Sequence, residues 1–216
     1  MISKRIKQIK KYIPLNQDVA DVGSDHGLLL RLLFDDGFPN KMLGIENKEG
    51  PFSNLSKLVK AINAENVSCV LSNGIDYLPS NYKTVVIAGM GLDTIKAIIN
   101  KNKDKIDFIS DFIIDCHTSY EKVRPFFVEL GYHVAEETII FEDNIYYEII
   151  HFKKGPQNYT ALELTYGPII LLEKSENFIN RNKLLIKKNE LICSKRPNSD
   201  KLRLKIHELK QVSNIE

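Results

Sequence analysis

The chain has 216 residues, 43% of them hydrophobic and 27% charged, with a net charge of +2 at pH 7. This composition is ordinary for a globular protein and excludes full disorder, and the length fits one domain with room for an appendage. The sequence has no run of about eighteen apolar residues, which excludes a membrane span. The basic N-terminus has no apolar stretch behind it and is not a secretory signal, so we expect a cytoplasmic protein.

The cysteines suggest neither a metal site nor a disulfide framework. Cys69, Cys116 and Cys193 lie far apart in the sequence and form no C-x-x-C pair. Each is interpreted as a small apolar packing residue, and we expect no bound metal.

Positive charge is concentrated at the two ends of the chain. The segment 156–216 carries eleven Lys and Arg against seven Asp and Glu, and residues 1–11 carry five basic residues and no acid. This distribution suits a protein that binds a polyanion, although a solvated helix face is the alternative interpretation. The candidates for binding a polyanion are Lys4, Arg5, Lys183, Lys187, Lys188, Lys195 and Arg196.

Short β-branched runs alternate with segments of helical spacing over the first 130 residues. The runs predict five strands, at 18–22, 42–46, 67–71, 84–88 and 111–115. The segments between them predict helices at 28–34, 52–62, 94–99 and 120–130. Because the runs are almost entirely apolar, we expect a parallel sheet that is covered by helices on both faces.

The pattern changes after Gly131. Two further strand-like runs, 132–141 and 145–152, are separated only by three turn residues, which predicts a hairpin. A parallel sheet closed by an antiparallel hairpin at one edge is typical of class I methyltransferases with a Rossmann-like sheet. Segment 155–158 indicates a linker, and the apolar spacing beyond it predicts two long helices in a hairpin. We therefore expect an α/β domain at 1–155 and a small all-α, coiled-coil domain at 156–216.

The strongest local motif is Asp21-Val-Gly-Ser-Asp-His-Gly27, which follows the first predicted strand and opens a helix. A glycine at such a turn lets a ligand approach the backbone, and the helix N-terminus offers free N–H groups. The spacing differs from the G-x-G-x-x-G of dinucleotide binders, and an acid at the strand end suits the ammonium and sulfonium groups of S-adenosylmethionine. A tight turn without a ligand is the alternative. The predicted cofactor contacts of this motif are Asp21, Gly23 and Ser24.

Three further features stand at the ends of the next strands. Glu46 lies where an acid can accept both ribose hydroxyls of an adenosine, and the amide of Asn73 can bind an adenine edge. The glycines of Ala88-Gly-Met-Gly91 leave space for a flat ligand. Because open α/β sheets bind ligands at the carboxyl ends of their strands, the joint pattern is more specific than any one member. It adds these predicted cofactor contacts: Glu46, Asn47, Asn73, Gly74, Ala88, Gly89 and Met90.

Taken together, these motifs resemble those of the bacterial tRNA (adenine(22)-N1)-methyltransferase family. The similar segments span most of the chain and are 21–27, 44–46, 50–51, 87–91, 123–124, 130–132, 146–148 and 166–168. The resemblance implies transfer of a methyl group from S-adenosylmethionine to N1 of an adenine in tRNA, at position 22. It also implies that the C-terminal coiled-coil domain helps to hold the tRNA. We expect a monomer that needs no metal and no membrane.

The chain departs from the family pattern at three places. The family has Asp where this chain has Asn73, a small residue at Leu92, and a Gln-Pro-Asn element where this chain has Asp-Cys-His-Thr at 115–118. Adenine N1 carries its own lone pair, so positioning supplies most of the catalysis, although the base must be unpaired or flipped. The candidate catalytic residues are Asp25 and His26, which could supply polar contacts at the cofactor mouth.

Two other functions are compatible with the same motifs. The first is a non-catalytic module on a methyltransferase fold that binds tRNA or protein, which the retained Asp21, Gly23, Glu46 and Gly89 disfavour. The second is a small-molecule or protein methyltransferase, which the basic ends and the helical tail disfavour.

Overall fold

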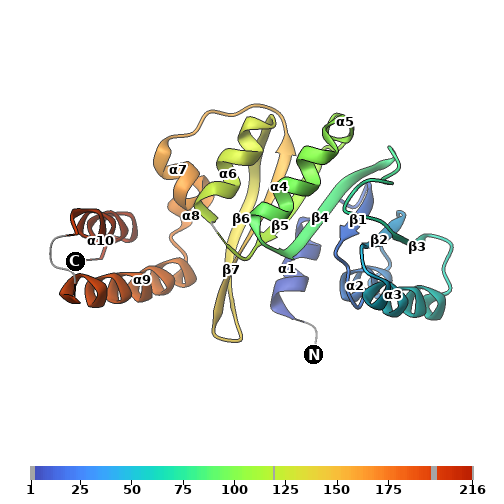
Figure 1. The fold of residues 1–216 in the computed structure, drawn as a ribbon, viewed down its shortest axis with the longest axis horizontal. Helices are drawn as coiled ribbons and strands as arrows, with labels where there is room; N and C mark the ends of the chain where they lie inside the picture. Colours follow the sequence, from blue (N-terminus) through green and yellow to red (C-terminus); the bar gives the residue numbers. More distant parts are fainter. Residues whose placement is uncertain (1–2, 119, 196–198, 216) are drawn as a thin grey trace.

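The computed structural model describes residues 3–118, 120–195 and 199–215. A seven-stranded sheet with helices on both faces forms its centre, and two long helices lie side by side at the end opposite α2 and α3 (Figure 1). The strands are β1 (Asp18–Val22), β2 (Met42–Glu46), β3 (Val67–Leu71), β4 (Tyr82–Met90), β5 (Asp111–Cys116), β6 (Tyr132–Glu142) and β7 (Ile145–Lys154). The helices are α1 (Lys4–Tyr12), α2 (Leu28–Asp35), α3 (Glu49–Ile62), α4 (Leu92–Lys101), α5 (Lys103–Ile106), α6 (Tyr120–Glu129), α7 (Ala161–Tyr166), α8 (Pro168–Glu173), α9 (Glu176–Lys195) and α10 (Asp200–Ser213). No helix of the described segments is long and apolar enough to cross a membrane.

The strand order is β3-β2-β1-β4-β5-β7-β6. Strands β1 to β5 pair in parallel, while β7 runs antiparallel to both β5 and β6. The predicted α/β, Rossmann-like sheet with an antiparallel C-terminal hairpin is therefore confirmed. Because β1 to β5 all point the same way, the ends of neighbouring strands meet at one edge of the sheet, where a ligand can touch several of them.

The side chains of the strands alternate between two apolar cores. In β4, Val85 and Ile87 belong to the core under α4 and α6, whereas Val86 belongs to the core under α1, α2 and α3. All three are 0% exposed, which explains why the runs read as continuously apolar. Full burial of an aliphatic side chain of this size contributes about 1.5–3 kcal/mol.

Helix α1 is an element that the sequence analysis did not predict. The Ser3 hydroxyl accepts the N–H of Ile6 at 3.4 Å, and Glu142 of the hairpin accepts the backbone N–H of Lys4 at 2.6 Å. These two acceptors satisfy the first free N–H groups of the helix. Ile9 and Tyr12 are buried against the sheet. The basic N-terminal segment is therefore a helix with one apolar face.

The C-terminal tail has its own core. Two short helices, α7 and α8, precede the two long helices α9 and α10, and only the long pair was predicted. Helix α7 begins with a capping box made by Thr160 and Glu163. The tail then packs against β6 through buried residues that form one cluster, which comprises Ile139, Tyr166, Ile170, Phe178, Ile186, Leu209 and Val212.

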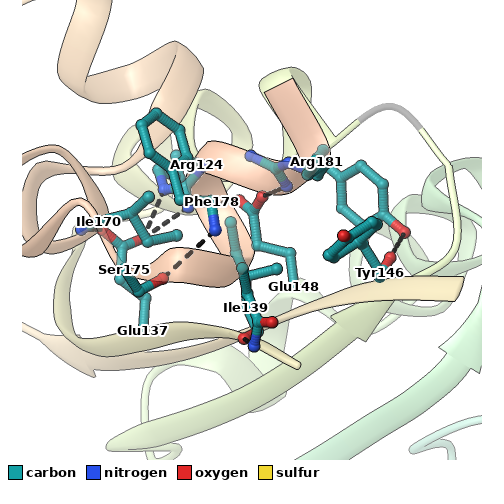
Figure 2. A network of polar contacts seen from close by, with 11 residues as sticks. Arg124, Glu137, Ile139, Tyr146, Glu148, Ile170, Ser175, Phe178 and Arg181 are labelled. Atoms are coloured by element: carbon teal, nitrogen blue, oxygen red, sulfur yellow. Dashed lines mark hydrogen bonds and ion pairs between the residues drawn. The ribbon is translucent and has the colours of Figure 1, made fainter. Parts of the chain in front are cut away.

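A buried network of ion pairs ties the tail to the sheet (Figure 2). Arg124 of α6 is 0% exposed and donates from Nε and Nη2 to Oε2 of Glu137, at 2.8 and 2.5 Å. Its Nη2 also donates to Oε1 of Glu148 on β7. The other oxygen of Glu148 accepts from Nη1 of Arg181 on α9, at 2.5 Å. The network thus joins α6, both hairpin strands and α9.

Gly167, between α7 and α8, makes room for this network. Its φ is +99°, and a Cβ built there would lie 2.4 Å from Oε1 of Glu137 and 2.7 Å from Nη2 of Arg124. Oε1 of Glu137 accepts the backbone N–H groups of Ile169 and Ile170, at 2.8 and 3.1 Å, at the start of α8. A side chain at position 167 would collide with the carboxylate that caps the helix, so only glycine fits.

Candidate active site

Two adjoining cavities open at the carboxyl ends of the parallel strands. The first, of about 200 Å³, is lined by residues that follow β1, β2 and β3 and by α4. The second, of about 120 Å³, lies between the loop after β1 and helix α1, and Gly23 lines both. Nearly all of the predicted cofactor contacts line one cavity or the other; the exceptions are Glu46 and Gly89. The first cavity holds Gly23, Asn47, Asn73, Gly74 and Met90, and the second holds Asp21, Gly23, Ser24 and Ala88.

Asp21 is a buried acid at the end of β1. Its side chain accepts a hydrogen bond of 2.7 Å from the Ser24 hydroxyl, and among the described residues no Lys, Arg or His forms an ion pair with it. Burial, with a smaller contribution from the charge of Glu46, raises the pKa of Asp21 to about 6 even though Ser24 lowers it. A cationic ligand group beside this carboxylate would compensate a charge that the protein itself leaves uncompensated.

Glu46 ends β2 and is 6% exposed. One of its oxygens accepts the backbone N–H of Asp25, which fixes the loop after β1 against the end of β2. Asp25 has a φ of 48°, a conformation that is uncommon for a residue other than glycine. Glu46 therefore organises the loop as well as standing where the sequence predicts a ribose contact.

The wall of the first cavity has a glycine packed closely against Ile98 and, at Ser72, a hydroxyl without a described partner. Gly74 has a φ of +60°, and a Cβ built there would lie 2.7 Å from Cγ2 of Ile98. The hydroxyl of Ser72 is buried and has no hydrogen-bond partner among the described residues. An adenosine needs a narrow slot with polar groups in its wall, and the residues present fit that group.

The candidate catalytic residues Asp25 and His26 stand at the rim of the second cavity. Their side chains are 66% and 62% exposed, and Oδ2 of Asp25 lies 3.7 Å from Nε2 of His26. Both are free to meet a substrate, and their catalytic role stays a prediction.

A polar cluster lies at the end of β5, in the segment 115–118 that replaces the Gln-Pro-Asn element of the family. Asp115 is 0% exposed, and its Oδ2 lies 3.0 Å from Nη1 of Arg5. The same Nη1 lies 3.1 Å from Nε2 of His117, and the Arg5 guanidinium lies 5.0 Å from the centre of the Tyr147 ring. Oδ1 of Asp115 has no partner among the described residues. Burial raises the pKa of Asp115, although Arg5 and His117 oppose the shift.

This cluster borders the predicted cofactor contact Gly89. A Cβ built on Gly89 would lie 3.8 Å from Nε2 of His117 and 3.9 Å from Nη1 of Arg5. Two signals for Asp115 were present in the sequence: its place at the end of a strand, which also identified Asp21 and Glu46, and the departure of segment 115–118 from the family pattern. Its partner Arg5 could not be found this way, because it comes from the unpredicted helix α1, 110 residues earlier.

The candidates for binding a polyanion differ in their exposure to solvent. Arg5 is 25% exposed and is held by Asp115, rather than standing free on a basic surface. Five candidates are exposed, one on α1 and four on α9, namely Lys4, Lys183, Lys187, Lys188 and Lys195. The last, Arg196, lies outside the described residues. Within the described segments, no group of three or more His, Cys, Asp or Glu is placed to hold a metal ion.

Comparison with known proteins points the same way as this geometry. A tRNA (adenine(22)-N(1))-methyltransferase of Bacillus subtilis is 25% identical over 189 residues, which are 83% of this chain and 79% of that protein. The crystal structure of Sp1610 of Streptococcus pneumoniae, a proposed tRNA (m1A22) methyltransferase, is similar with a TM-score of 0.93 at 26% identity, over 99% of this chain and 100% of that chain. Sp1610 in complex with S-adenosyl-L-methionine is similar with a TM-score of 0.89 at 27% identity, again over 99% and 100%.

The resemblance that the motifs indicated is thus confirmed across both parts of the fold. A family model described as a methyltransferase domain matches residues 2–150, from before α1 into β7. That match covers more than half of the chain and includes both cavities and the Asp115 cluster. The chain therefore belongs to the methyltransferase domain family.

Proposed function

We propose that the protein transfers a methyl group from S-adenosylmethionine to N1 of an adenine in tRNA, at position 22. The observation that carries this proposal is the pair of adjoining cavities at the strand ends, with a buried, uncompensated carboxylate in one and the polar side chains of Ser72 and Asn73 in the wall of the other. The activity named for the Bacillus subtilis relative and the cofactor bound to Sp1610 support the same reaction.

The two cavities divide the cofactor between them. The adenine and ribose occupy the first cavity, with Asn73 at the adenine edge. Glu46 lines neither cavity and accepts the ribose hydroxyls from the adjoining end of β2. The ammonium group lies beside Asp21 in the second cavity, where it neutralises a charge that burial otherwise penalises. Gly23 lines both cavities, so the chain of the cofactor crosses the backbone where no side chain stands in the way.

S-adenosylmethionine supplies the methyl group as an electrophile, and adenine N1 supplies its own lone pair, so the protein needs no nucleophile of its own. Its residues have to hold the base in line and exclude water. Asp115 is the acceptor for the exocyclic amine of the adenine: its Oδ1 has no described partner but is buried, so neighbouring side chains have to move aside for the base, while Arg5 holds the other oxygen at 3.0 Å. The rings of His117 and Tyr147, whose centres lie 5.8 Å apart, lie beside Arg5 in the same cluster. Asp25 and His26 add polar contacts at the mouth.

The C-terminal segment 156–216 acts in this proposal as a coiled-coil domain that holds the tRNA. Its exposed lysines on α9 contact backbone phosphates, and a tRNA substrate agrees with the cytoplasmic location that the sequence predicts. The protein works as a monomer, because one chain contributes both cavities, the Asp115 cluster and the basic helix α9.

The direct test is mass spectrometry of nucleosides from unmodified tRNA incubated with the protein and labelled S-adenosylmethionine. We expect 1-methyladenosine that carries the label. A control transcript with guanine in place of adenine 22 should gain no label. A label on cytosine C5 or on adenine N6 would contradict the assignment. So would an unlabelled tRNA together with full binding of the cofactor, which would favour the non-catalytic module.

Glu46→Ala should weaken cofactor binding by about 1.5–3 kcal/mol, the range for a hydrogen bond to a charged group. The variant loses the acceptor for the ribose and for the N–H of Asp25, while the sheet stays intact. Calorimetric titration with S-adenosylhomocysteine measures the change, and Glu49→Ala, on the exposed first turn of α3, is the control. An unchanged affinity in a folded Glu46→Ala protein would remove Glu46 from the site.

A further inference from the structure

A third cavity, of about 560 Å³, lies between the methyltransferase sheet and the long C-terminal helices. We call it the tyrosine pocket, because three tyrosine side chains line it: Tyr120 of α6, Tyr146 of β7 and Tyr166 of α7. Helices α9 and α10 close the other side with Arg181, Asn182 and Lys201 among their contributions. Its volume falls within the range of about 300–1,000 Å³ that is usual for ligand sites, and the methyl-transfer reaction makes no use of it.

Charge at the tyrosine pocket favours an anionic partner. Of the three cations in its lining, Arg181 is paired with Glu148 and Lys205 with Glu208, whereas Lys201 is exposed without an ion pair to any described residue. Of the two acids in the lining, Glu148 is neutralised by Arg124 and Arg181, which leaves Glu121 at the exposed rim. The ammonium of Lys205 lies 4.6 Å from the centre of the Tyr166 ring. Aromatic faces interleaved with cations are the surface on which nucleic-acid bases stack while their phosphates are bound.

The wall of the pocket also contains polar atoms that the described protein leaves unpaired. Asn182 is 0% exposed, and its amide nitrogen donates to Oγ of Ser213 at 2.7 Å, but its Oδ1 has no described partner. Nε of Arg181 is likewise buried without a described acceptor. One open acceptor and one open donor beside aromatic rings match the edge of a base better than they match an aliphatic ligand.

The tyrosine pocket and the Asp115 cluster lie on opposite faces of β7, near the end of the sheet where β5 ends and β7 begins. Tyr146 and Tyr147 are consecutive on β7, and successive side chains of a strand point to opposite faces. Tyr147 contacts Arg5 and His117, whereas Tyr146 lines the pocket. The hydroxyl of Tyr120 donates to the carbonyl of Tyr146 at 3.3 Å, and Tyr120 follows closely after the end of β5. A strand of RNA with one base at Asp115 would therefore reach the pocket by passing over the end of β5 and the start of β7.

We propose that the tyrosine pocket binds the base of a second, unpaired nucleotide of the same RNA, stacked on Tyr146 or its neighbouring rings, with the adjoining phosphate held by Lys201. This inference rests on the proposed function, because it takes the RNA to be the substrate bound at Asp115. A nucleotide bound in the tyrosine pocket fixes the register of the RNA on the protein. The register in turn determines which adenine reaches the methyl group.

Photocrosslinking tests the contact directly in the full-length protein. A tRNA transcript that contains 4-thiouridine is irradiated in complex with the protein and S-adenosylhomocysteine, and the modified peptides are identified by mass spectrometry. We expect labelled nucleotides on Tyr120, Tyr146 or Tyr166. Tyr77, which is 73% exposed between β3 and β4, is the control tyrosine and should stay unlabelled. Labelling of Tyr77 alone, or of none of the three pocket tyrosines, would overturn the proposal.

Two variants test the energetics. Tyr146→Leu should weaken tRNA binding by about 5- to 150-fold, the loss expected for one base–aromatic stack, with Tyr77→Leu as the control.

Lys201 lies on the exposed surface, so the Lys201→Ala variant should fold normally. It should lower the dependence of log K on log salt by about 0.7, the value for one phosphate contact to a single strand, compared with exposed Lys57→Ala. Unchanged tRNA affinity and salt dependence in the Lys201 variant would contradict the proposal even if Tyr146→Leu were unstable.

These measurements distinguish failure of the pocket proposal from failure of the proposed function. Cross-links and weakened binding without any methyl transfer would support the pocket and contradict the proposed function. Methyl transfer at normal KM by both pocket variants would support the reaction and contradict the pocket. A free mononucleotide or a peptide that binds the pocket without competing with tRNA would also contradict it.

Discussion

Replacing Arg124 by methionine should lower the free energy of unfolding by about 3–5 kcal/mol, which is the cost of removing one partner from a buried ion pair. Two carboxylates, of Glu137 and Glu148, would be left in a dry interior. Glu148 would keep one charged partner, Arg181, and Glu137 would keep only backbone N–H donors at the start of α8. The free energy of unfolding of a natural domain is about 5–15 kcal/mol, so the expected loss is a large share of the stability. Urea unfolding at pH 7 measures it.

Lys122→Ala, on an exposed position of the same helix, is the matched control and should change stability by no more than about 0.5 kcal/mol. Adding Glu137→Gln to the Arg124→Met protein should recover part of the loss, because a neutral amide costs less to bury than an unpaired carboxylate. A loss below about 1 kcal/mol for Arg124→Met would show that water reaches the network, and the network would then not hold the tail.

Glu148 of the same network predicts a dependence on pH, whereas burial raises the pKa of the neighbouring Glu137, which therefore does not contribute to it. Burial alone would raise the pKa of Glu148, but Arg124 and Arg181 together lower it. An acid whose pKa is lower in the folded state contributes stability that is present above its unfolded pKa of about 4.3 and is lost as the pH falls through the folded value. Acid unfolding of the wild type should therefore begin below about pH 4, and part of this dependence should vanish in Arg124→Met.

The central strands and the cofactor end of the site could be predicted because each depends on local sequence. Runs such as Thr84–Ala88 are apolar on both faces, so they identify buried parallel strands without any knowledge of their neighbours. The acids Asp21 and Glu46 stand at strand ends, and the topology alone brings strand ends together. The helix α4 that lines the first cavity was likewise visible in its apolar spacing.

The remainder depends on contacts between distant segments, which no local pattern contains. Helix α1 was not predicted because five of its nine residues are basic. In addition, the acceptor for its first backbone N–H is Glu142 of the distant hairpin. Arg5 meets Asp115 across 110 positions of sequence, and Arg124 meets Glu148 across 24. A charged residue in a sequence is more often solvated than buried. From its charge, Arg5 was therefore predicted to lie on a surface that binds a polyanion, and no structural role was predicted for Arg124.

Asp21→Asn should stabilise the fold at pH 8 while weakening binding of the cofactor. Burial raises the pKa of Asp21 from 3.8 to about 6. A group whose folded pKa is raised contributes stability that is complete below its unfolded pKa and is lost as the pH rises through its folded pKa. Since each pKa unit corresponds to about 1.4 kcal/mol, the ionised carboxylate costs the folded state about 3 kcal/mol at pH 8, and asparagine removes that cost.

Urea unfolding of both proteins at pH 8 and pH 4 measures the stability, and titration with S-adenosylhomocysteine at pH 8 measures the affinity. We expect a gain of about 2–3 kcal/mol at pH 8 that falls below about 1 kcal/mol at pH 4, where Asp21 is protonated in the wild type. Affinity should fall more than tenfold, because the amide no longer offsets the ammonium charge, while exposed Asp93→Asn should change neither quantity. A wild-type affinity that rises with pH through about 6, and an affinity of the variant that does not, would identify Asp21 as the titrating group. Stability that is equal in the two proteins at pH 8 would instead show that the folded chain already compensates this carboxylate, leaving no cost for a cationic ligand to relieve.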